Sequence, residues 1–449
     1  MHINNIKSFY SVHENKILYF TLLLFLLLRF FYVFEFGNFD KSTFVDASGY
    51  NEYAKTILSD SSWLTRTDFI ASKREPFYPL FVACIYFLFG KESFLAVYLV
   101  QAFLSTLMLL IIYKMADLVV NNKVVAYLSL LWAGFYIFYL RWIGELLRET
   151  LVYFLYSLFF YLLFKLLKNK SVKIKSILFI SVIFTLLFHT DGRYLFYAPF
   201  LIILFLIYLR PIWLALKNYI IFGLLVVIFT VPWSIRNYIA YGDLIVVSNY
   251  TLNLTGSELS ARNELFDTSD IKETKPSLHF GNFNQNYPTE TERDSIIAGF
   301  NPRNRSNSEL LAIKKGKRAA TSFLGRKAYF FKKMWAPFIT GGYYAPFPMA
   351  YYEEGYSISH NIISICQYGI LIPFALFSMI YGIIKKKKWL WFFIIPIFVH
   401  MLLHIVTFGI ERYRHPVDAF IIILAMYGIV YIINLIFKHT HLSNNNKIY

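Results

Sequence analysis

The sequence predicts an all-α membrane protein, and composition, apolar runs and charge placement are the observations that predict it. Hydrophobic residues make up 57% of the 449 residues and aromatic residues 20%, and the mean hydropathy is +0.49. A water-soluble chain of this length could not cover so much apolar surface, so the bilayer is its expected solvent. Apolar runs that could each form a membrane-spanning helix recur about ten times.

Each expected span is an apolar run bounded by polar or charged residues. The expected spans are Ile17–Phe34, Phe94–Tyr113, Val124–Leu140, Thr150–Leu167, Ile177–His189, Tyr194–Leu209, Tyr219–Trp233, Ile362–Ile384, Trp389–Val406 and Val417–Phe437. No small-residue cleavage site follows the first run, so it is expected to remain as an uncleaved signal anchor. One further run, Phe77–Gly90, is short and contains Pro79, which favours a helix at the membrane surface.

The basic residues fix the expected orientation, because most of them lie in short clusters between the apolar runs. If the N-terminus is inside and Phe77–Gly90 does not cross, the clusters at 165–175 and 385–388 fall on the inner side, as the positive-inside rule requires. We therefore expect a multi-pass protein of the cytoplasmic (inner) membrane, with both termini cytoplasmic and the active site extracytoplasmic. The net charge of +17 then meets anionic headgroups, and no nucleic-acid partner is expected.

Three regions are expected along the chain. Residues 1–236 form an N-terminal transmembrane catalytic module whose first outer loop is 35–93, residues 237–361 form a long extracytoplasmic loop, and residues 362–449 form the C-terminal transmembrane helices. The long loop contains a basic, helical-looking run, Glu309–Trp335, which could lie on anionic headgroups.

The first outer loop carries the first candidate for chemistry, Asp46. The residues Tyr50, Tyr53 and Ala54 that follow it share one helical face, so a helix should lie along the membrane here. Asp46 could cap that helix, or it could be a general base that removes a proton from an acceptor hydroxyl. The two roles can coexist.

Glu149, with Glu145 four residues earlier on the same expected helical face, lies at the outer end of an expected span. It could be a solvated helix end or a partner of Arg141 or Arg148. It could also orient a basic residue, or join Asp46 in holding a divalent cation.

Arginines from separate outer segments could form a phosphate clamp, because the guanidinium fork matches phosphate oxygens. These arginines are Arg74, Arg193, Arg236, Arg412 and Arg414. Contact with lipid headgroups is the alternative for each of them. Cys84 and Cys366 lie in apolar runs and suggest no disulfide, the His and Cys spacings suggest no zinc site, and no Gly-rich phosphate loop occurs.

Short motifs carry a family resemblance. They are Asp46 followed by Tyr50 and Ala54, Arg74-Glu-Pro-Phe-Tyr78-Pro with Gln101-Ala-Phe-Leu-Ser, Glu149-Thr-Leu, Pro232-Trp-Ser-Ile-Arg236-Asn237 with Gly242 and Asn253, and Arg412-Tyr-Arg414-His-Pro416. In order and spacing the chain resembles bacterial polytopic glycosyltransferases of the GT-C fold, related to protein O-mannosyltransferases and the lipid A aminoarabinose transferase.

This resemblance implies a multi-span helical bundle with a juxtamembrane helix in the first outer loop, and a polyprenyl-phosphate sugar as donor. It implies that Asp46 is the base and that Glu149 matches an acidic residue of the second outer loop. Tyr50 and Tyr78, which lie in the motifs, join the five arginines as candidate substrate-binding residues. The protein mannosyltransferases carry an Asp-Glu pair in the first loop, whereas Ala47 follows Asp46 here.

The expected function is an inverting transfer of a sugar from the lipid donor to a lipid, glycan or protein acceptor. The alternative is a transporter or flippase for a lipid-linked saccharide, although no internal repeat is visible and the polar residues gather at one face. A scaffold of a surface-polysaccharide complex is a third candidate. No organic cofactor is expected, and a divalent cation such as Mg²⁺ or Mn²⁺ is compatible with the carboxylate pair.

Overall fold

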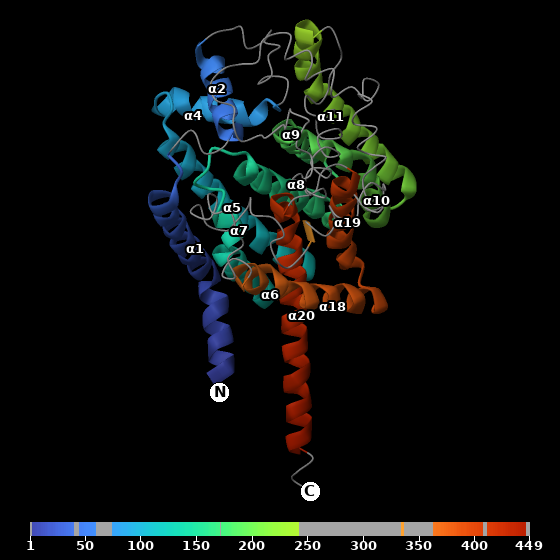
Figure 1. Cartoon of the computed structure of the whole chain (residues 1–449). Helices are drawn as coiled ribbons and strands as arrows, with labels where there is room; N and C mark the ends of the chain where they lie inside the picture. Colours follow the sequence, from blue (N-terminus) through green and yellow to red (C-terminus); the bar gives the residue numbers. More distant parts are fainter. Residues whose placement is uncertain are drawn as a thin grey trace, which may run out of the picture.

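The computed structural model describes residues 2–39, 45–59, 74–170, 172–241, 334–335, 362–406 and 411–445, and these form helices with no strand among them (Figure 1). The helices are α1 (His2–Phe36), α2 (Val45–Ser59), α4 (Phe77–Phe89), α5 (Phe94–Val120), α6 (Lys123–Phe135), α7 (Ile137–Leu140), α8 (Glu149–Asn169), α9 (Ile174–Thr190), η2 (Gly192–Tyr197), α10 (Ala198–Tyr208), α11 (Ile212–Tyr241), η5 (Ile365–Gly369), α18 (Leu371–Ile384), η6 (Lys388–Leu390), α19 (Trp391–Val406) and α20 (Glu411–Asn445).

Seven helical stretches within the described residues are long and apolar enough to cross a membrane. They are Glu14–Phe36, Phe94–Val120, Glu149–Asn169, Ile212–Ile239, Ile362–Ile384, Lys388–Ile405 and Arg412–Phe437. The other three expected spans correspond to shorter apolar helices, Lys123–Phe135, Ile174–Thr190 and Gly192–Tyr208. The expectation of an all-helical membrane fold is confirmed, while these three segments are shorter than a full crossing usually needs.

Local breaks explain the shorter helices. Tyr136 adopts an extended backbone with ψ of 107°, which separates α6 from α7 inside the expected span Val124–Leu140. Asp191 is also extended, and its side chain accepts a hydrogen bond from the backbone N–H of Arg193. A residue of this kind caps a helix start, so α9 ends and η2 begins at this point.

The segment Phe77–Gly90 forms the short helix α4, as expected. Its 13 residues extend about 20 Å at the usual rise per residue, less than the hydrocarbon thickness of a bilayer. Helix α4 packs against α2 at the end of the molecule opposite the two chain termini (Figure 1). Tyr50, Tyr53 and Ala54 of α2 are buried, as their shared helical face predicts.

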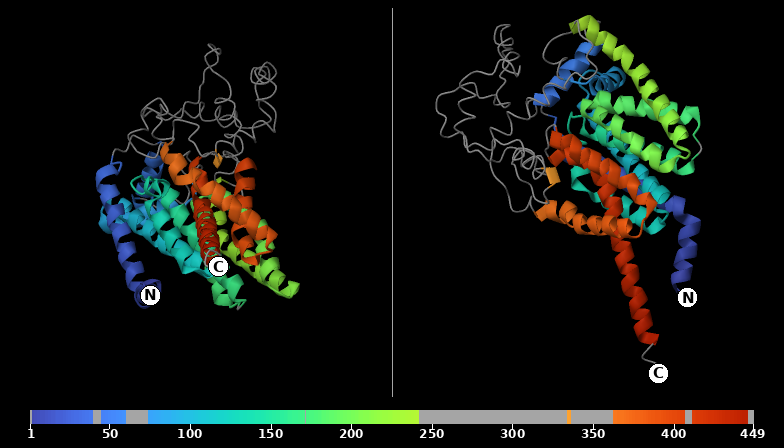
Figure 2. Two further views of the ribbon diagram at one scale, coloured as in Figure 1. Left: turned by 90° about the horizontal axis from the view of Figure 1, so that it is seen from below. Right: turned by 90° about the vertical axis from the view of Figure 1, so that its right-hand side faces the viewer.

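Helices α5, α8 and α20 form the centre of the bundle. α5 packs against α1, α6 and α8, while α20 packs against α18, α6, α8 and α19. The right-hand view of Figure 2 shows α20 continuing beyond the other helices toward the C-terminus, on the same side as the N-terminus. Most of the expected loop 237–361, including nearly all of Glu309–Trp335, lies outside the described residues.

Candidate active site

Asp46 lies in the first turn of α2, between two guanidinium groups from distant parts of the chain. Its side chain is 50% exposed, and its Oδ1 lies 3.3 Å from Nη1 of Arg74. Its Oδ2 lies 3.8 Å from Nη2 of Arg412, at the start of α20. A carboxylate at a helix N-terminus also interacts favourably with the helix dipole.

Glu149 is the first residue of α8 and lies against the same arginine. Its Oε1 is 3.3 Å from Nη1 of Arg412, and its side chain is only 7% exposed. The guanidinium of Arg412 therefore bridges the carboxylates at the N-terminal ends of α2 and α8. The second oxygen of Glu149 has no hydrogen-bond partner among the described residues. The structure thus brings Asp46, Glu149 and Arg412 together, as the sequence motifs predict.

The charges around Asp46 hold it ionised. Burial would raise the pKa of Asp46, but the positive charges of Arg74, Arg412 and Arg148 outweigh that effect and keep the pKa below its ordinary value. The carboxylate can therefore accept a proton at neutral pH without first losing one.

A second group of charges centres on Asp191. Nε of Arg193 lies 2.8 Å from its Oδ1, Nη2 of Arg193 also contacts its Oδ2, and Nη2 of Arg148 lies 3.3 Å from the same oxygen. Burial opposes ionisation of Asp191, but the charges of Arg148 and Arg193 prevail and hold its pKa well below its ordinary value. Sequence reasoning placed Arg193 in the site but missed Arg148 and Asp191 as members of it.

Tyr413 joins the two groups of charges. The guanidinium carbon of Arg193 lies 3.5 Å from the centre of the Tyr413 ring, and Nη2 of Arg412 donates to the Tyr413 hydroxyl over 3.4 Å. We call the eight side chains the charged cluster: Asp46, Glu149, Asp191, Arg74, Arg148, Arg193, Arg412 and Tyr413. Its four guanidinium groups exceed its three carboxylates by one positive charge, which suits a singly charged anion.

The two candidate tyrosines support Arg74. The guanidinium carbon of Arg74 lies 4.3 Å from the centre of the Tyr50 ring, a cation–π contact. The Tyr50 ring packs edge-on against Tyr78, whose hydroxyl donates to Oε1 of Gln101. Both tyrosines are buried. In this structure Tyr50 positions Arg74 through its ring, and Tyr78 holds the Tyr50 ring in place.

Arg414 is a correction to the predicted phosphate clamp, because it lies in a different network. Its side chain is fully buried, and its Nε lies 3.0 Å from Oδ1 of Asp418 on the same helix. Its guanidinium carbon lies 3.4 Å from the centre of the Tyr368 ring, and its Nη1 donates to the carbonyl of Met334. An enclosed guanidinium paired in this way is not placed to bind a phosphate beside Asp46.

Arg236 lies on α11, near the end of the described part of that helix. Its Nη1 donates to Oδ1 of Asn237, and its guanidinium carbon lies 5.0 Å from the centre of the Trp233 ring. These contacts hold Arg236 against its own helix.

Glu145 lies apart from Glu149, although their spacing suggested one helical face. Residues 141–148 form turns rather than helix, so the two carboxylates do not share a face. Glu145 pairs with Arg141 at 2.7 Å and accepts a hydrogen bond from Asn38. Burial raises the pKa of Glu145, and the charge of Arg141 only partly opposes this effect.

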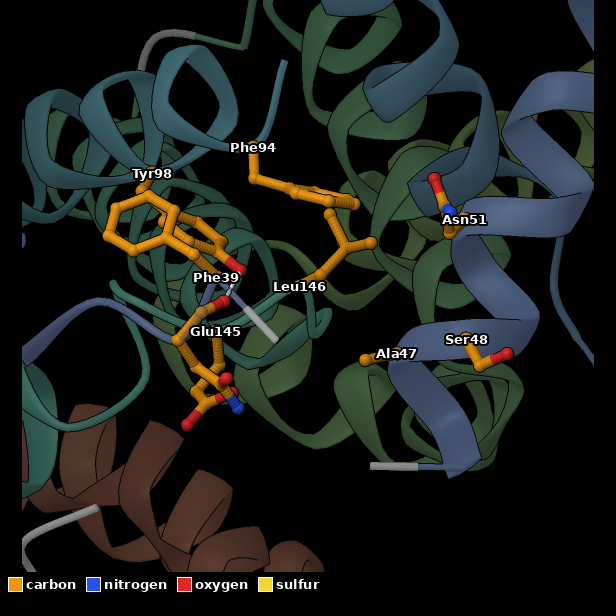
Figure 3. A pocket seen from close by; sticks show the side chains of 9 residues that line it. Phe39, Ala47, Ser48, Asn51, Phe94, Tyr98, Glu145 and Leu146 are labelled. Carbon is orange, nitrogen blue, oxygen red and sulfur yellow. Dashed lines mark hydrogen bonds between the residues drawn. The ribbon is translucent and has the colours of Figure 1, made fainter. Parts of the chain in front are cut away.

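Figure 3 shows a pocket beside α2 into which Glu145 projects. Phe39, Phe94 and Tyr98 line one side of it, and Ala47, Ser48 and Asn51 of α2 line the other. Several of its polar groups are already bonded: Asn38 donates to Glu145 across the lining, and Asn51 donates to Glu92 and accepts from Tyr86. The pocket therefore lies where α2 packs against neighbouring segments. Asp46 is not among its lining residues.

Arg412 contacts both Asp46 and Glu149, so a guanidinium group lies where the carboxylate pair suggested a divalent cation. Among the described residues, no group of three or more His, Cys, Asp or Glu is placed to hold a metal ion. The cation suggested by the carboxylate pair stays a prediction.

The fold is that of GT-C type glycosyltransferases, by its architecture and by its likeness to solved structures. The chain is similar to the archaeal oligosaccharyltransferase AglB from Archaeoglobus fulgidus in complex with an inhibitory peptide and a dolichol-phosphate. The identity is 11%, the TM-score is 0.50, and the match covers 94% of this chain and 52% of that one. For the Archaeoglobus fulgidus oligosaccharyltransferase tethered to an acceptor peptide, the values are 10%, 0.52, 97% and 51%. The chain thus spans about half the length of these structures.

Residues 73–235 match the family of dolichyl-phosphate-mannose-protein mannosyltransferases. The matched stretch includes Arg74, Glu149 and Arg193 of the charged cluster. No curated protein matches the chain by sequence. The resemblance to polytopic GT-C glycosyltransferases is confirmed by the family match and the shared fold together.

Proposed function

We propose that the chain is an inverting glycosyltransferase that moves a sugar from a polyprenyl-phosphate donor to a lipid, glycan or protein acceptor on the outer face of the cytoplasmic membrane. The observation that carries this proposal is the bridge that Arg412 makes between Asp46 and Glu149. The bridge joins an ionised carboxylate, which can take a proton, to a guanidinium group, which can bind a phosphate oxygen.

The proposed reaction is one displacement at the anomeric carbon. The acceptor oxygen forms the new bond to that carbon while the bond to the phosphate oxygen breaks, and the phosphate leaves with the electron pair. The acceptor proton passes to Asp46. Because its pKa is lowered, Asp46 is a weak base, so we expect the proton to move late, when the acceptor oxygen is already bonded.

The leaving group explains the charge of the cluster. A polyprenyl-phosphate sugar carries one negative charge, and departure of the sugar adds negative charge to the same phosphate. A cluster with one excess positive charge would bind the donor and would stabilise the leaving phosphate more strongly. Preorganised charges of this kind are the largest contribution to many enzymatic rates.

We propose that transfer needs no divalent cation, because Arg412 supplies positive charge at the place where the carboxylates could otherwise hold one. Transfer measured with a chelator such as EDTA should equal transfer in added Mg²⁺ or Mn²⁺. Loss of transfer in EDTA, restored by either metal, would show that Arg412 moves aside for a cation.

The substitution Asp46→Asn tests the function directly. In vesicles from the native membrane supplied with labelled polyprenyl-phosphate sugars, we expect transfer to fall at least about a hundredfold while donor binding survives, as for loss of a general base. Asp117→Asn is the matched control, because Asp117 is a partly exposed acid that pairs with Lys123 on α6. Equal transfer by Asp46→Asn and Asp117→Asn would remove Asp46 from its proposed role.

A further inference from the structure

Two buried aromatic side chains hold polar atoms that nothing in the described part of the protein satisfies. His189 lies in the last turn of α9 and is 7% exposed, and neither of its ring nitrogens has a hydrogen-bond partner among the described residues. Trp233 of α11 is 8% exposed, and its indole N–H also has none. The ring centres lie 6.3 Å apart at an interplanar angle of 74°.

Such groups need an explanation, because a buried polar atom without a partner loses its bonds to water and gains none from the protein. Other buried histidines in the structure are bonded. His400 contacts the Tyr197 hydroxyl through Nδ1 and the Tyr413 carbonyl through Nε2. Nδ1 of His415 accepts from the Trp142 indole, and only its Nε2 has no partner among the described residues. His189 differs from these two histidines because both of its nitrogens lack a partner, and the Trp233 ring beside it has an unbonded N–H as well.

His189 lies two residues before Asp191, a member of the charged cluster. Arg148, which binds Asp191, also donates to the carbonyl of Thr190, the residue after His189. Trp233 lies under the guanidinium of Arg236, three residues along α11. A ligand whose phosphate is bound by the charged cluster could thus place its neighbouring groups against His189 and Trp233.

The chemistry of the pair distinguishes a sugar from a phosphate. A neutral histidine offers one N–H donor and one lone pair, and an indole offers one donor. A phosphate diester accepts hydrogen bonds but cannot donate one, so it would leave the lone pair of His189 unmatched. A hydroxyl group both donates and accepts, and adjacent hydroxyl groups of a sugar could satisfy all three atoms.

We propose that His189 and Trp233 form the binding site for hydroxyl groups of the transferred sugar. This inference rests on the proposed function, since it assigns the glycosyl part of the donor to a place beside the cluster that binds its phosphate. The two residues are positioned to select the sugar, and no proton transfer to the reacting atoms is assigned to them.

The test compares His189→Phe with His400→Phe by thermal unfolding of the purified full chain in detergent. His189→Phe removes unmatched nitrogens and keeps the ring, so the unliganded variant should unfold at the same temperature as the wild type or higher. His400→Phe leaves Tyr197 and the Tyr413 carbonyl without their partner and should unfold at a lower temperature. A loss of stability in His189→Phe equal to that in His400→Phe would show that His189 is satisfied by bound water, and would overturn the proposal.

The same measurement with ligand separates sugar from phosphate. The probes are polyprenyl phosphate alone and polyprenyl phosphate carrying mannose, glucose, galactose or arabinose. In the wild type, the matching glycosylated lipid should raise the unfolding temperature more than the bare lipid. In His189→Phe the shift with bare lipid should persist, the extra shift should vanish, and the KM for the donor should rise at least tenfold.

Retention of the extra shift in His189→Phe, and in Trp233→Phe as a second variant, would overturn the sugar site while leaving the proposed function intact. If no probe, glycosylated or bare, shifts the wild-type protein, the proposed function fails, and this inference fails with it.

Discussion

Arg412 and Arg414 stand two residues apart in one motif, yet they belong to different parts of the molecule. At about 100° per residue, two helical positions point to nearly opposite sides of α20. Arg412 reaches acids from two other elements, Asp46 of α2 and Glu149 of α8. Arg414 pairs with Asp418 one turn along its own helix, and Tyr136 donates to the same carboxylate.

The difference teaches how to separate a binding arginine from a structural one. The Arg414 pair is sealed, since both side chains are fully buried and are enclosed by Tyr368 and Met334. Around Arg412, Asp46 remains half exposed and Glu149 keeps an oxygen without a partner. A ligand can therefore reach the Arg412 cluster, whereas the Arg414–Asp418 pair is fully buried and closed to one. The predictions below test this distinction.

The largest expected effect is on transfer by Arg412→Gln. Removing the charge that bridges Asp46 and Glu149 should lower kcat by about 10²–10³-fold, the usual effect of losing one preorganised charge or donor. Labelled sugar transfer in vesicles measures the loss. The unfolding temperature of the unliganded variant should change little, because the substituted amide can still bond to Glu149. A large loss of stability with normal specific activity would reverse the assignment of the two arginines.

Arg414→Met should act on stability and not on chemistry. It leaves Asp418 as a buried carboxylate without its guanidinium partner, which typically destabilises a protein by about 3–5 kcal/mol. Thermal or denaturant unfolding in detergent measures this effect. The double variant Arg414→Met/Asp418→Leu should recover much of the loss, because no buried charge then remains. The protein that stays folded should transfer sugar at nearly the wild-type rate, and a selective loss of transfer would place Arg414 in the site.

Much of the architecture could be predicted from the sequence, because apolar length and charge placement are directly visible there. The short helix Phe77–Phe89 and the buried face of α2 follow from hydropathy and from helical periodicity. The break at Tyr136 was missed, because apolar residues continue on both sides of it inside the expected span Val124–Leu140. The break at Asp191 was expected, since one predicted span ends at His189 and the next begins at Tyr194. The separation of Glu145 from Glu149 was missed because a spacing of four residues gives one face only where the helix includes both, and α8 begins at Glu149.

The sequence predicted those residues of the site that belong to a recognisable motif. Asp46, Glu149 and Arg412 each belong to a motif, and the structure places them together. Arg148 and Asp191 were missed because their pairing joins two loops that are distant in sequence, although the Asp-Gly-Arg193 spacing hints at a local ion pair. Arg414 was misplaced because a dense basic motif does not show which side of the helix faces the bundle.

A smaller effect should appear in the pH dependence of Arg74→Gln. Arg74 is the strongest of the charges that lower the pKa of Asp46, so its removal should raise that pKa. Asp46 acts as a base only when ionised, and the acid limb of kcat/KM should therefore move to higher pH. Transfer near pH 5 should fall more than transfer near pH 8.

Arg74→Lys keeps the charge and should largely restore the wild-type pH profile. An identical acid limb in Arg74→Gln and the wild type would mean that the ionisation of Asp46 does not set the acid limb.

The smallest predicted effect concerns the close approach of Arg74 to α2. A Cβ atom added at Gly49 would lie 2.4 Å from Nη2 of Arg74, so Gly49→Ala should push the guanidinium off the helix and away from Asp46. Transfer should fall by about threefold to tenfold, as in Arg74→Gln but by less, while the helix itself is stabilised by the higher helix propensity of Ala.

Gly223→Ala on α11 is the control, since a Cβ there meets nothing within 4 Å. Both variants should be as stable as the wild type, and only Gly49→Ala should lose activity and shift its acid limb upward. If Gly49→Ala instead matches Gly223→Ala in rate and in pH profile, the contact between Arg74 and Asp46 does not control the reaction, and the function of the cluster would depend on Arg412 alone.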